Sequence, residues 1–180
     1  KHIQEQVGIT FVYVTHDQEE ALTMSDLIAV MKDGLLQQLG DPVTLYKTPT
    51  NQFVADFIGE SNLIKGKVDL LGEGKARIMI GGEQVEVSSG EGNLMAGQAI
   101  TLTIRPEKID LSRQGTGGLS GTVQDRVYIG TDTRYIVALH SGETVIVRVQ
   151  NGCDSEAGEF AKGERVTVRW RPEDARVLMY

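Results

Sequence analysis

The chain has 180 residues, of which 40% are hydrophobic, and a formal net charge of −7 at pH 7. This length allows one domain or two small ones with a buried core. Neither half has the basic excess that nucleic-acid binding requires, and no apolar run reaches the roughly 20 residues of a membrane-spanning helix. Cys153 is the single cysteine, which excludes an intramolecular disulfide or a cysteine-based zinc site and favours a reducing cytoplasm.

The glycines are spread unevenly along the chain. Four of the 21 lie in residues 1–59 and the others in residues 60–180, so the second stretch is expected to be rich in β turns. We therefore predict two domains, with residues 1–59 in the first and residues 60–180 in the second.

The N-terminal stretch is typical of the inside of a domain. The chain begins with Lys1 instead of Met, and "KHIQEQVGI" has the character of a helix end that runs into a strand. We expect an N-terminally truncated piece of a longer protein. Residues 9–14, "ITFVYV", are an apolar and β-branched run, which predicts a strand covered on both faces, as in a parallel sheet.

His16 follows this predicted strand and precedes a predicted helix over residues 17–25. Asp17 can cap the helix, and Glu20 stands three positions later, as in a capping box. Ligands of open α/β sheets lie outside the carboxyl ends of strands, so an imidazole placed here is able to contact a phosphate. The alternative is an ordinary helix-capping or core histidine. We interpret Glu19 and Glu20 as solvated first-turn acids and not as a metal pair.

The rest of the first domain is predicted to be a hairpin and two short helices. Lys32-Asp33-Gly34 between two apolar runs is a strong hairpin signal. One helix is expected after Asp41-Pro42, with the proline at an early helical position, and a second within residues 51–59.

Residues 60–180 show alternating apolar and polar positions between glycine-containing turns, which predicts an all-β module. The strands are expected over residues 63–71, 75–81, 83–88, 99–106, 119–130, 133–140, 144–150 and 164–172.

This second domain also repeats itself. Residues 100–111 align with residues 166–178, with Arg105-Pro106-Glu107 and Arg171-Pro172-Glu173 standing 66 residues apart. We predict two related β units, about 62–112 and 118–180, stacked into one barrel-like domain. The Arg-Pro pairs have a simple structural explanation, since proline cannot donate to a strand ladder and so ends a strand.

The stretch "YVTHDQEEALTMSDLIAVMKDGLLQQLGDPVTLYKTPTNQFVADFIGESN" closely resembles the last part of the ATP-binding subunit of ABC importers, in the subgroup with a C-terminal regulatory (TOBE) domain. This resemblance implies an α/β tail of a nucleotide-binding domain over residues 1–59, then an all-β, OB-like (TOBE/MOP-like) barrel. It also implies that His16 is the switch-loop histidine that approaches the γ-phosphate of ATP. ATP and Mg²⁺ are the cofactors expected for the intact protein.

Other motifs of that family do not occur in these residues. The 180 residues contain no GxxxxGK[ST] phosphate-binding loop, no acidic metal-binding strand with its catalytic carboxylate, and no Leu-Ser-Gly-Gly-Gln motif. "GGLSG" at residues 117–121 only scrambles those letters and is interpreted as a linker turn. We expect the chain alone neither to bind ATP tightly nor to hydrolyse it, and we expect no metal site in it.

The second domain could hold a small oxyanion of its own. Its candidate donors are Arg126, Tyr128, Thr131, Arg134 and Arg148. Arginine and tyrosine on exposed strand faces are, however, usually solvated or paired across strands, and this is the competing interpretation.

Residues 121–151 resemble the matching region of polyamine (spermidine/putrescine) importers more than that of maltose-type subunits. The resemblance implies a cytoplasmic ATPase (a translocase) on the inner face of the membrane, a homodimer formed through the regulatory domain, permease subunits and a solute-binding protein. The alternatives are a sugar or ferric-iron importer, a stand-alone oxyanion or solute sensor, and a simple dimerisation element.

Overall fold

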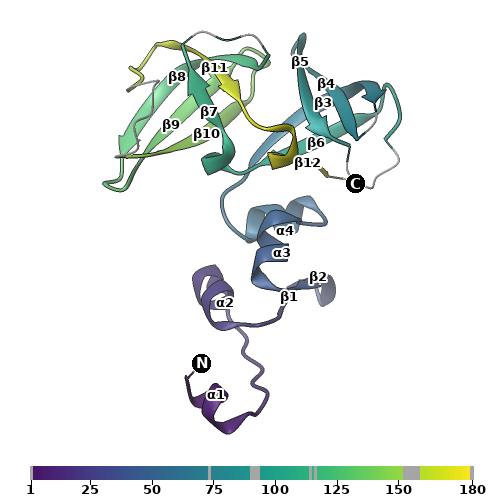
Figure 1. Ribbon diagram of the computed structural model, residues 1–180, viewed down its shortest axis with the longest axis vertical. Coiled ribbons are helices and arrows are strands. Elements are labelled where there is room, and N and C mark those ends of the chain that lie inside the picture. The colour runs from purple at the N-terminus through teal and green to yellow at the C-terminus, as the bar shows by residue number, and fades with distance from the viewer. Residues whose placement is uncertain are drawn as a thin grey trace. The chain divides into compact units, whose positions relative to one another are not determined.

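The structure is a computed structural model that describes residues 2–72, 74–89, 94–113, 115, 117–151 and 159–178 (Figure 1). The chain separates into two compact units, Lys1–Gly59 (unit 1) and Glu60–Tyr180 (unit 2). Cys153, on which the disulfide and zinc arguments depend, lies outside the described residues.

Unit 1 contains short helices and one hairpin. Its elements are α1 (His2–Val7), α2 (Gln18–Met24), β1 (Ile28–Lys32), β2 (Leu35–Gly40), α3 (Pro42–Lys47) and α4 (Gln52–Phe57). The predicted hairpin is confirmed, because Asp33 and Gly34 both have positive φ, 51° and 78°, as a tight Asp-Gly turn between twisted strands requires. Asp41 and Asn51 cap the two predicted helices α3 and α4. Ile28, Val30, Leu45, Val54 and Ile58 form the core of this unit.

The predicted strand over residues 9–14 is wrong. This segment is extended but belongs to no strand, and its side chains are exposed, with Val12 at 90% and Val14 at 91%. A strand forms only by pairing with a neighbour, and none of the described strands pairs with this segment. The helix that follows begins at Gln18, as expected, with Asp17 as its N-cap.

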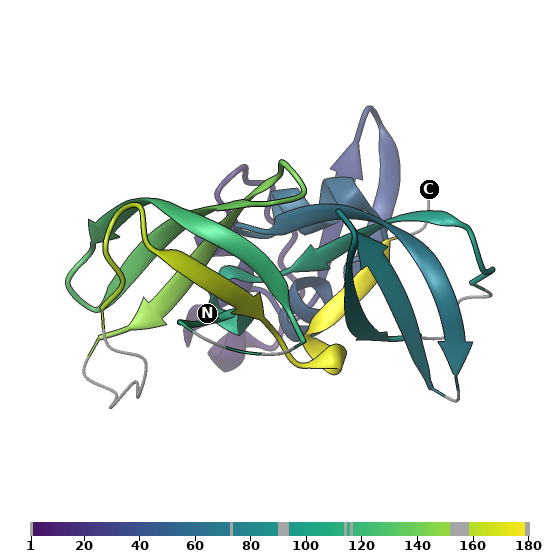
Figure 2. The same cartoon turned by 90° about the horizontal axis from the view of Figure 1, so that it is seen from above.

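Unit 2 consists of two five-stranded antiparallel sheets of the same design (Figure 2). The first sheet has the order β12-β6-β3-β4-β5, with β3 (Asn62–Gly72), β4 (Lys75–Ile80), β5 (Glu83–Ser88), β6 (Ala99–Ile104) and β12 (Ala175–Leu178). The second has the order β10-β9-β8-β11-β7, with β7 (Asp110–Ser112), β8 (Leu119–Tyr128), β9 (Asp132–Leu139), β10 (Thr144–Gln150) and β11 (Arg165–Arg169).

The two sheets exchange their last strands. After β6 the 3₁₀ turn Pro106–Lys108 carries the chain across to β7 in the second sheet, and after β11 the turn Pro172–Asp174 carries it back to β12 in the first. The repeated Arg-Pro-Glu triplets therefore lie at the two points where the chain passes from one sheet to the other, in addition to ending β6 and β11. The short strands β7 and β12 were not predicted. The exchange joins both sheets around one hydrophobic core.

The sequence repeat is also visible in the details of the strands. β3 and β8 each carry a bulge, between Val68 and Leu70 and between Val123 and Asp125. Gly66 and Gly121 precede these bulges at the same position. The predicted linker turn at residues 117–121 is only partly correct, since β8 already begins at Leu119.

Candidate functional site

His16 lies in an exposed position immediately before α2. The helix start is fixed by Asp17, whose carboxylate accepts the backbone N–H groups of Glu19 at 2.9 Å and Glu20 at 3.1 Å. The Asp17 backbone N–H in turn donates to the Thr15 hydroxyl at 2.9 Å. These bonds on both sides of His16 hold its backbone, while its imidazole makes no hydrogen bond or ion pair within the described part of the chain.

Glu20 does not complete the expected capping box. Its carboxylate turns back to the preceding segment, where it accepts the Tyr13 hydroxyl at 2.8 Å and the Thr15 hydroxyl at 3.0 Å. The hydrogen bond to this carboxylate and its negative charge raise the pKa of Tyr13. Glu20 therefore links the first turn of α2 to Tyr13 and Thr15, which precede His16 in the chain.

None of the five candidate oxyanion donors lines the pocket described below, and three of them are paired with carboxylates. Arg126 is paired with Glu159 at 2.7 Å, Arg134 with Glu60, and Arg148 with Asp132 at 3.5 Å. The hydrogen bond that Arg126 donates to the Glu159 carboxylate raises the pKa of Arg126. Tyr128 and Thr131 are exposed near the β8–β9 turn.

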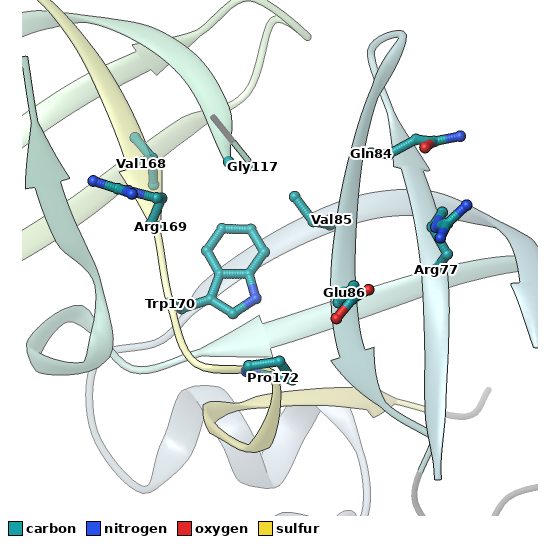
Figure 3. Close-up of a pocket in the computed structure, with 10 residues that line it drawn as sticks. Arg77, Gln84, Val85, Glu86, Gly117, Val168, Arg169, Trp170 and Pro172 are labelled. Atoms are coloured by element: carbon teal, nitrogen blue, oxygen red, sulfur yellow. The ribbon is translucent and has the colours of Figure 1, made fainter. Parts of the chain in front are cut away.

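A pocket lies elsewhere in unit 2, between β5 and β11 (Figure 3). Its volume is about 450 Å³, and its lining includes Val85, Glu86, Gly117, Arg169 and Trp170. It contains none of the residues proposed from the sequence. Sequence inspection offered one signal for it, the single tryptophan directly before the second Arg-Pro pair.

Among the described residues no cluster of three or more His, Cys, Asp or Glu side chains is placed to hold a metal ion. The sequence contains no GxxxxGK[ST] phosphate-binding loop, and His16 stays the nucleotide contact predicted from the sequence. In the described part of the chain no helix has both the length and the apolar character of a membrane crossing.

Residues 102–178 match the family model of the TOBE domain. The chain is 44% identical to the spermidine/putrescine import ATP-binding protein of Ruegeria pomeroyi over 99% of its own length and 48% of the relative's. It is 45% identical to the protein of the same name from Rubrobacter xylanophilus and 47% identical to one from Pseudomonas aeruginosa, with similar coverage. The chain thus spans about half the length of the curated relatives it matches.

Among solved structures, the chain is similar to the cytoplasmic molybdate-binding protein ModG, crystallised with molybdate bound. The TM-score is 0.55 at 18% identity, and the match covers 66% of this chain and 96% of that one. At this identity the likeness concerns the fold, which is the mostly-β architecture of unit 2. Over 99% of its length the chain is thus similar to about half of each of these spermidine/putrescine import ATP-binding proteins, and its residues 102–178 match the TOBE domain.

Proposed function

We propose that the full-length protein is the ATPase subunit of an ABC importer that takes up polyamines, with ATP and Mg²⁺ as cofactors. The similarity to spermidine/putrescine import ATP-binding proteins over 99% of the chain carries this proposal. Unit 1 is then the α/β tail of the nucleotide-binding domain and unit 2 its regulatory domain. Nucleotide binding closes the two ATPase subunits, and hydrolysis lets them reopen.

His16 is the residue of this chain that acts on the nucleotide. An imidazole is able to donate to a γ-phosphate oxygen or to accept from the attacking water, and phosphoryl transfer depends on such positioning. Its exposure and its anchored backbone on both sides support this role. No phosphate-binding loop occurs in these 180 residues, so this proposal requires the full-length protein to supply the loop and the metal ligands.

The exposed apolar side chains of unit 1 fit a segment that is covered by the rest of an ATPase domain. Val12 and Val14 in the extended segment, and Met31, Leu35 and Leu36 on the hairpin, are all exposed here. Exposure of these large apolar side chains to water is unfavourable, and burying them against further strands of an ATPase domain would lower the free energy.

The test is His16→Ala in the full-length protein. We expect ATP hydrolysis to fall by about 10²-fold or more while nucleotide binding is retained, because positioned acid–base groups contribute at least that much. Glu19→Gln, in the first turn of α2, is the matched control and should hydrolyse ATP at the wild-type rate. Unchanged turnover in the His16 variant refutes the assignment.

The transported solute and the partners are part of the same proposal. A permease in the membrane and a solute-binding protein are expected, with the ATPase subunit in the cytoplasm on the inner face. Uptake of labelled spermidine or putrescine by cells that carry the full-length system distinguishes polyamine transport from import of a sugar or of ferric iron. The 180-residue chain alone is expected to show no turnover.

A stand-alone oxyanion module is the second candidate, and the fold likeness to a molybdate-binding protein favours it. The ion pairs of Arg126, Arg134 and Arg148 argue against it, since an oxyanion has to displace those carboxylates. Isothermal titration of the chain with molybdate decides between the two. Tight binding that Arg134→Ala abolishes supports the oxyanion module.

A further inference from the structure

One position breaks the internal symmetry of unit 2. Asn62 stands four residues before Gly66, and the equivalent position, four residues before Gly121, is Gly117. Asn62 is 4% exposed, and its carboxamide contacts the backbone of the edge strand β10. It donates to the Ile146 carbonyl at 2.7 Å and accepts from the Ile146 N–H at 2.6 Å. Gly117 has no side chain with which to do the same.

The equivalent backbone in the first sheet is that of Glu86 on edge strand β5. Glu86 stands three residues after Glu83, as Ile146 does after Glu143. Beyond the end of β5 the Ser89 N–H donates to the Gly74 carbonyl, and hydrogen-bonded positions alternate along an antiparallel pair. By this alternation the N–H and C=O of Glu86 face away from β4, as those of Ile146 face away from β9.

The pocket lies where the missing carboxamide would stand. Glu86, Gly117 and Trp170 all line it. The β8–β11 ladder stops at Leu119 and Val168, whereas the equivalent β3–β6 ladder continues to Asn62 and Ile104. Trp170 occupies the position of Ile104.

Trp170 supplies a further donor to this space. Figure 3 shows its ring between β11 and β5, with the indole nitrogen turned toward β5. The indole N–H makes no hydrogen bond within the described residues. A half-buried indole N–H ordinarily finds an acceptor.

We propose that this pocket binds a small molecule that carries a primary carboxamide, seated on the Glu86 backbone as Asn62 is seated on that of Ile146. The carboxamide nitrogen donates to the Glu86 carbonyl, its oxygen accepts the Glu86 N–H, and the rest of the molecule packs beside Trp170. The volume of about 450 Å³ is in the range of small-ligand sites. A carboxylate of the same shape is disfavoured on this backbone, because it has no hydrogen to donate to the Glu86 carbonyl.

The probe is N-acetyl-L-asparagine N-methylamide, titrated into the ¹⁵N-labelled 180-residue chain and followed by NMR. We expect saturable shifts of the Glu86 amide and the Trp170 indole N–H. The isosteric N-acetyl-L-aspartate N-methylamide at neutral pH should shift neither. Equal responses to both probes, or shifts confined to other residues, overturn the proposal.

Two substitutions at one position isolate the backbone contact. Glu86→Pro removes the outward N–H without removing a β4–β5 hydrogen bond, and edge strands tolerate proline at such positions. Glu86→Ala keeps the N–H but removes the same side chain, which is otherwise paired with Lys75 at 3.3 Å on the surface. We expect Glu86→Ala to bind the probe as wild type and Glu86→Pro to bind it about tenfold more weakly. Equal affinities of the two variants contradict the proposal, provided the other amide resonances show the fold intact.

Discussion

The carboxylate of Glu83 accepts the backbone N–H of Ser120 at 2.9 Å and 3.1 Å through its two oxygens, and also accepts the Ser120 hydroxyl. The hairpin end of the first β unit is thereby tied to the first strand of the second. Glu143 makes the reciprocal contact, since its carboxylate accepts the Lys65 N–H at 3.1 Å. Glu83 and Glu143 thus join the two β repeats of unit 2 at equivalent positions.

Glu83→Ala should destabilise unit 2. The substitution leaves the partly buried Ser120 N–H without its acceptor, and loss of a hydrogen bond to a charged group costs about 1.5–3 kcal/mol of unfolding free energy. Urea unfolding of the chain measures this. Glu86→Ala on the same strand is the control, because its exposed pair with Lys75 is worth at most about 1 kcal/mol. If both variants lose the same stability, the carboxylate does not act as a tie.

Asn62→Ala should be at least as costly. It removes both hydrogen bonds to the Ile146 backbone, and an unsatisfied buried group costs about 1–3 kcal/mol. Asn62→Asp should not rescue the loss, since a carboxylate offers no hydrogen to the Ile146 carbonyl. The control is Gln124→Ala, an exposed position at the β8 bulge. A melting temperature equal to that of the control shows that the carboxamide carries no stability.

Gly66 and Gly121 should resist even a methyl group. A Cβ at Gly66 lies 2.5 Å from Ile78 Cγ2, and one at Gly121 lies 2.7 Å from Val137 Cγ1. Both neighbours are buried on the adjacent strand, so Gly66→Ala and Gly121→Ala should each cost about 1–3 kcal/mol through overpacking. Gly72→Ala, at the end of β3, meets nothing closer than 3.7 Å and should be nearly neutral in the same thermal-unfolding assay. Equal losses at Gly66 and Gly72 are incompatible with a packing effect.

Local chemistry made much of this architecture predictable. Asp33-Gly34 specifies its turn because few other pairs adopt positive φ twice, and Asp41-Pro42 begins a helix because the carboxylate caps it while proline fixes φ. The long strands of unit 2 were predictable because apolar and polar residues alternate along them. The strand predicted over residues 9–14 was wrong. Its apolar pattern is typical of a strand buried between neighbours, and none of the described strands pairs with this segment.

Non-local pairing explains what the sequence did not reveal. β7 and β12 are too short to show an alternation of apolar and polar residues. No local pattern in Asp110–Ser112 predicts that this strand pairs with β11 of the other repeat. The salt bridges of Arg126, Arg134 and Arg148 likewise join residues that are distant in sequence. Besides Trp170, the sequence signal for the pocket between β5 and β11 is the mismatch between Asn62 and Gly117, which becomes visible once the repeats are aligned.

The stability of helix α3 in unit 1 should depend on pH in the acid range, because its N-cap is the carboxylate of Asp41. Its carboxylate accepts the Thr44 hydroxyl and the N–H groups of Val43 and Thr44, and these bonds, the hydroxyl first, hold its pKa below the usual value. A depressed pKa in the folded state means that the cap stabilises above the unfolded pKa of about 3.9 and that this contribution is lost as the pH falls through the folded pKa. The amide resonances of Val43 and Thr44 should therefore hold their positions to below pH 3.9 and then move.

Asp41→Asn separates the cap from its charge. Asparagine is an equally good N-cap, so α3 should persist while the acid-dependent movement of those two resonances disappears. A transition that remains in this variant must come from another group.

We propose, finally, that unit 2 self-associates through the tip of the β8–β9 hairpin. Val127, Tyr128 and Ile129 are 43%, 66% and 48% exposed there, and contiguous apolar groups of this kind mark interfaces. Sedimentation velocity of the 180-residue chain should show a concentration-dependent dimer that Tyr128→Glu weakens by placing a charge in an apolar contact. Leu71→Glu, on the equivalent hairpin of the first β unit, is the matched control, since Leu71 is 46% exposed. A dimer lost in both variants points to a general effect of added charge, and a chain that stays monomeric at high concentration removes the hairpin tip as an interface.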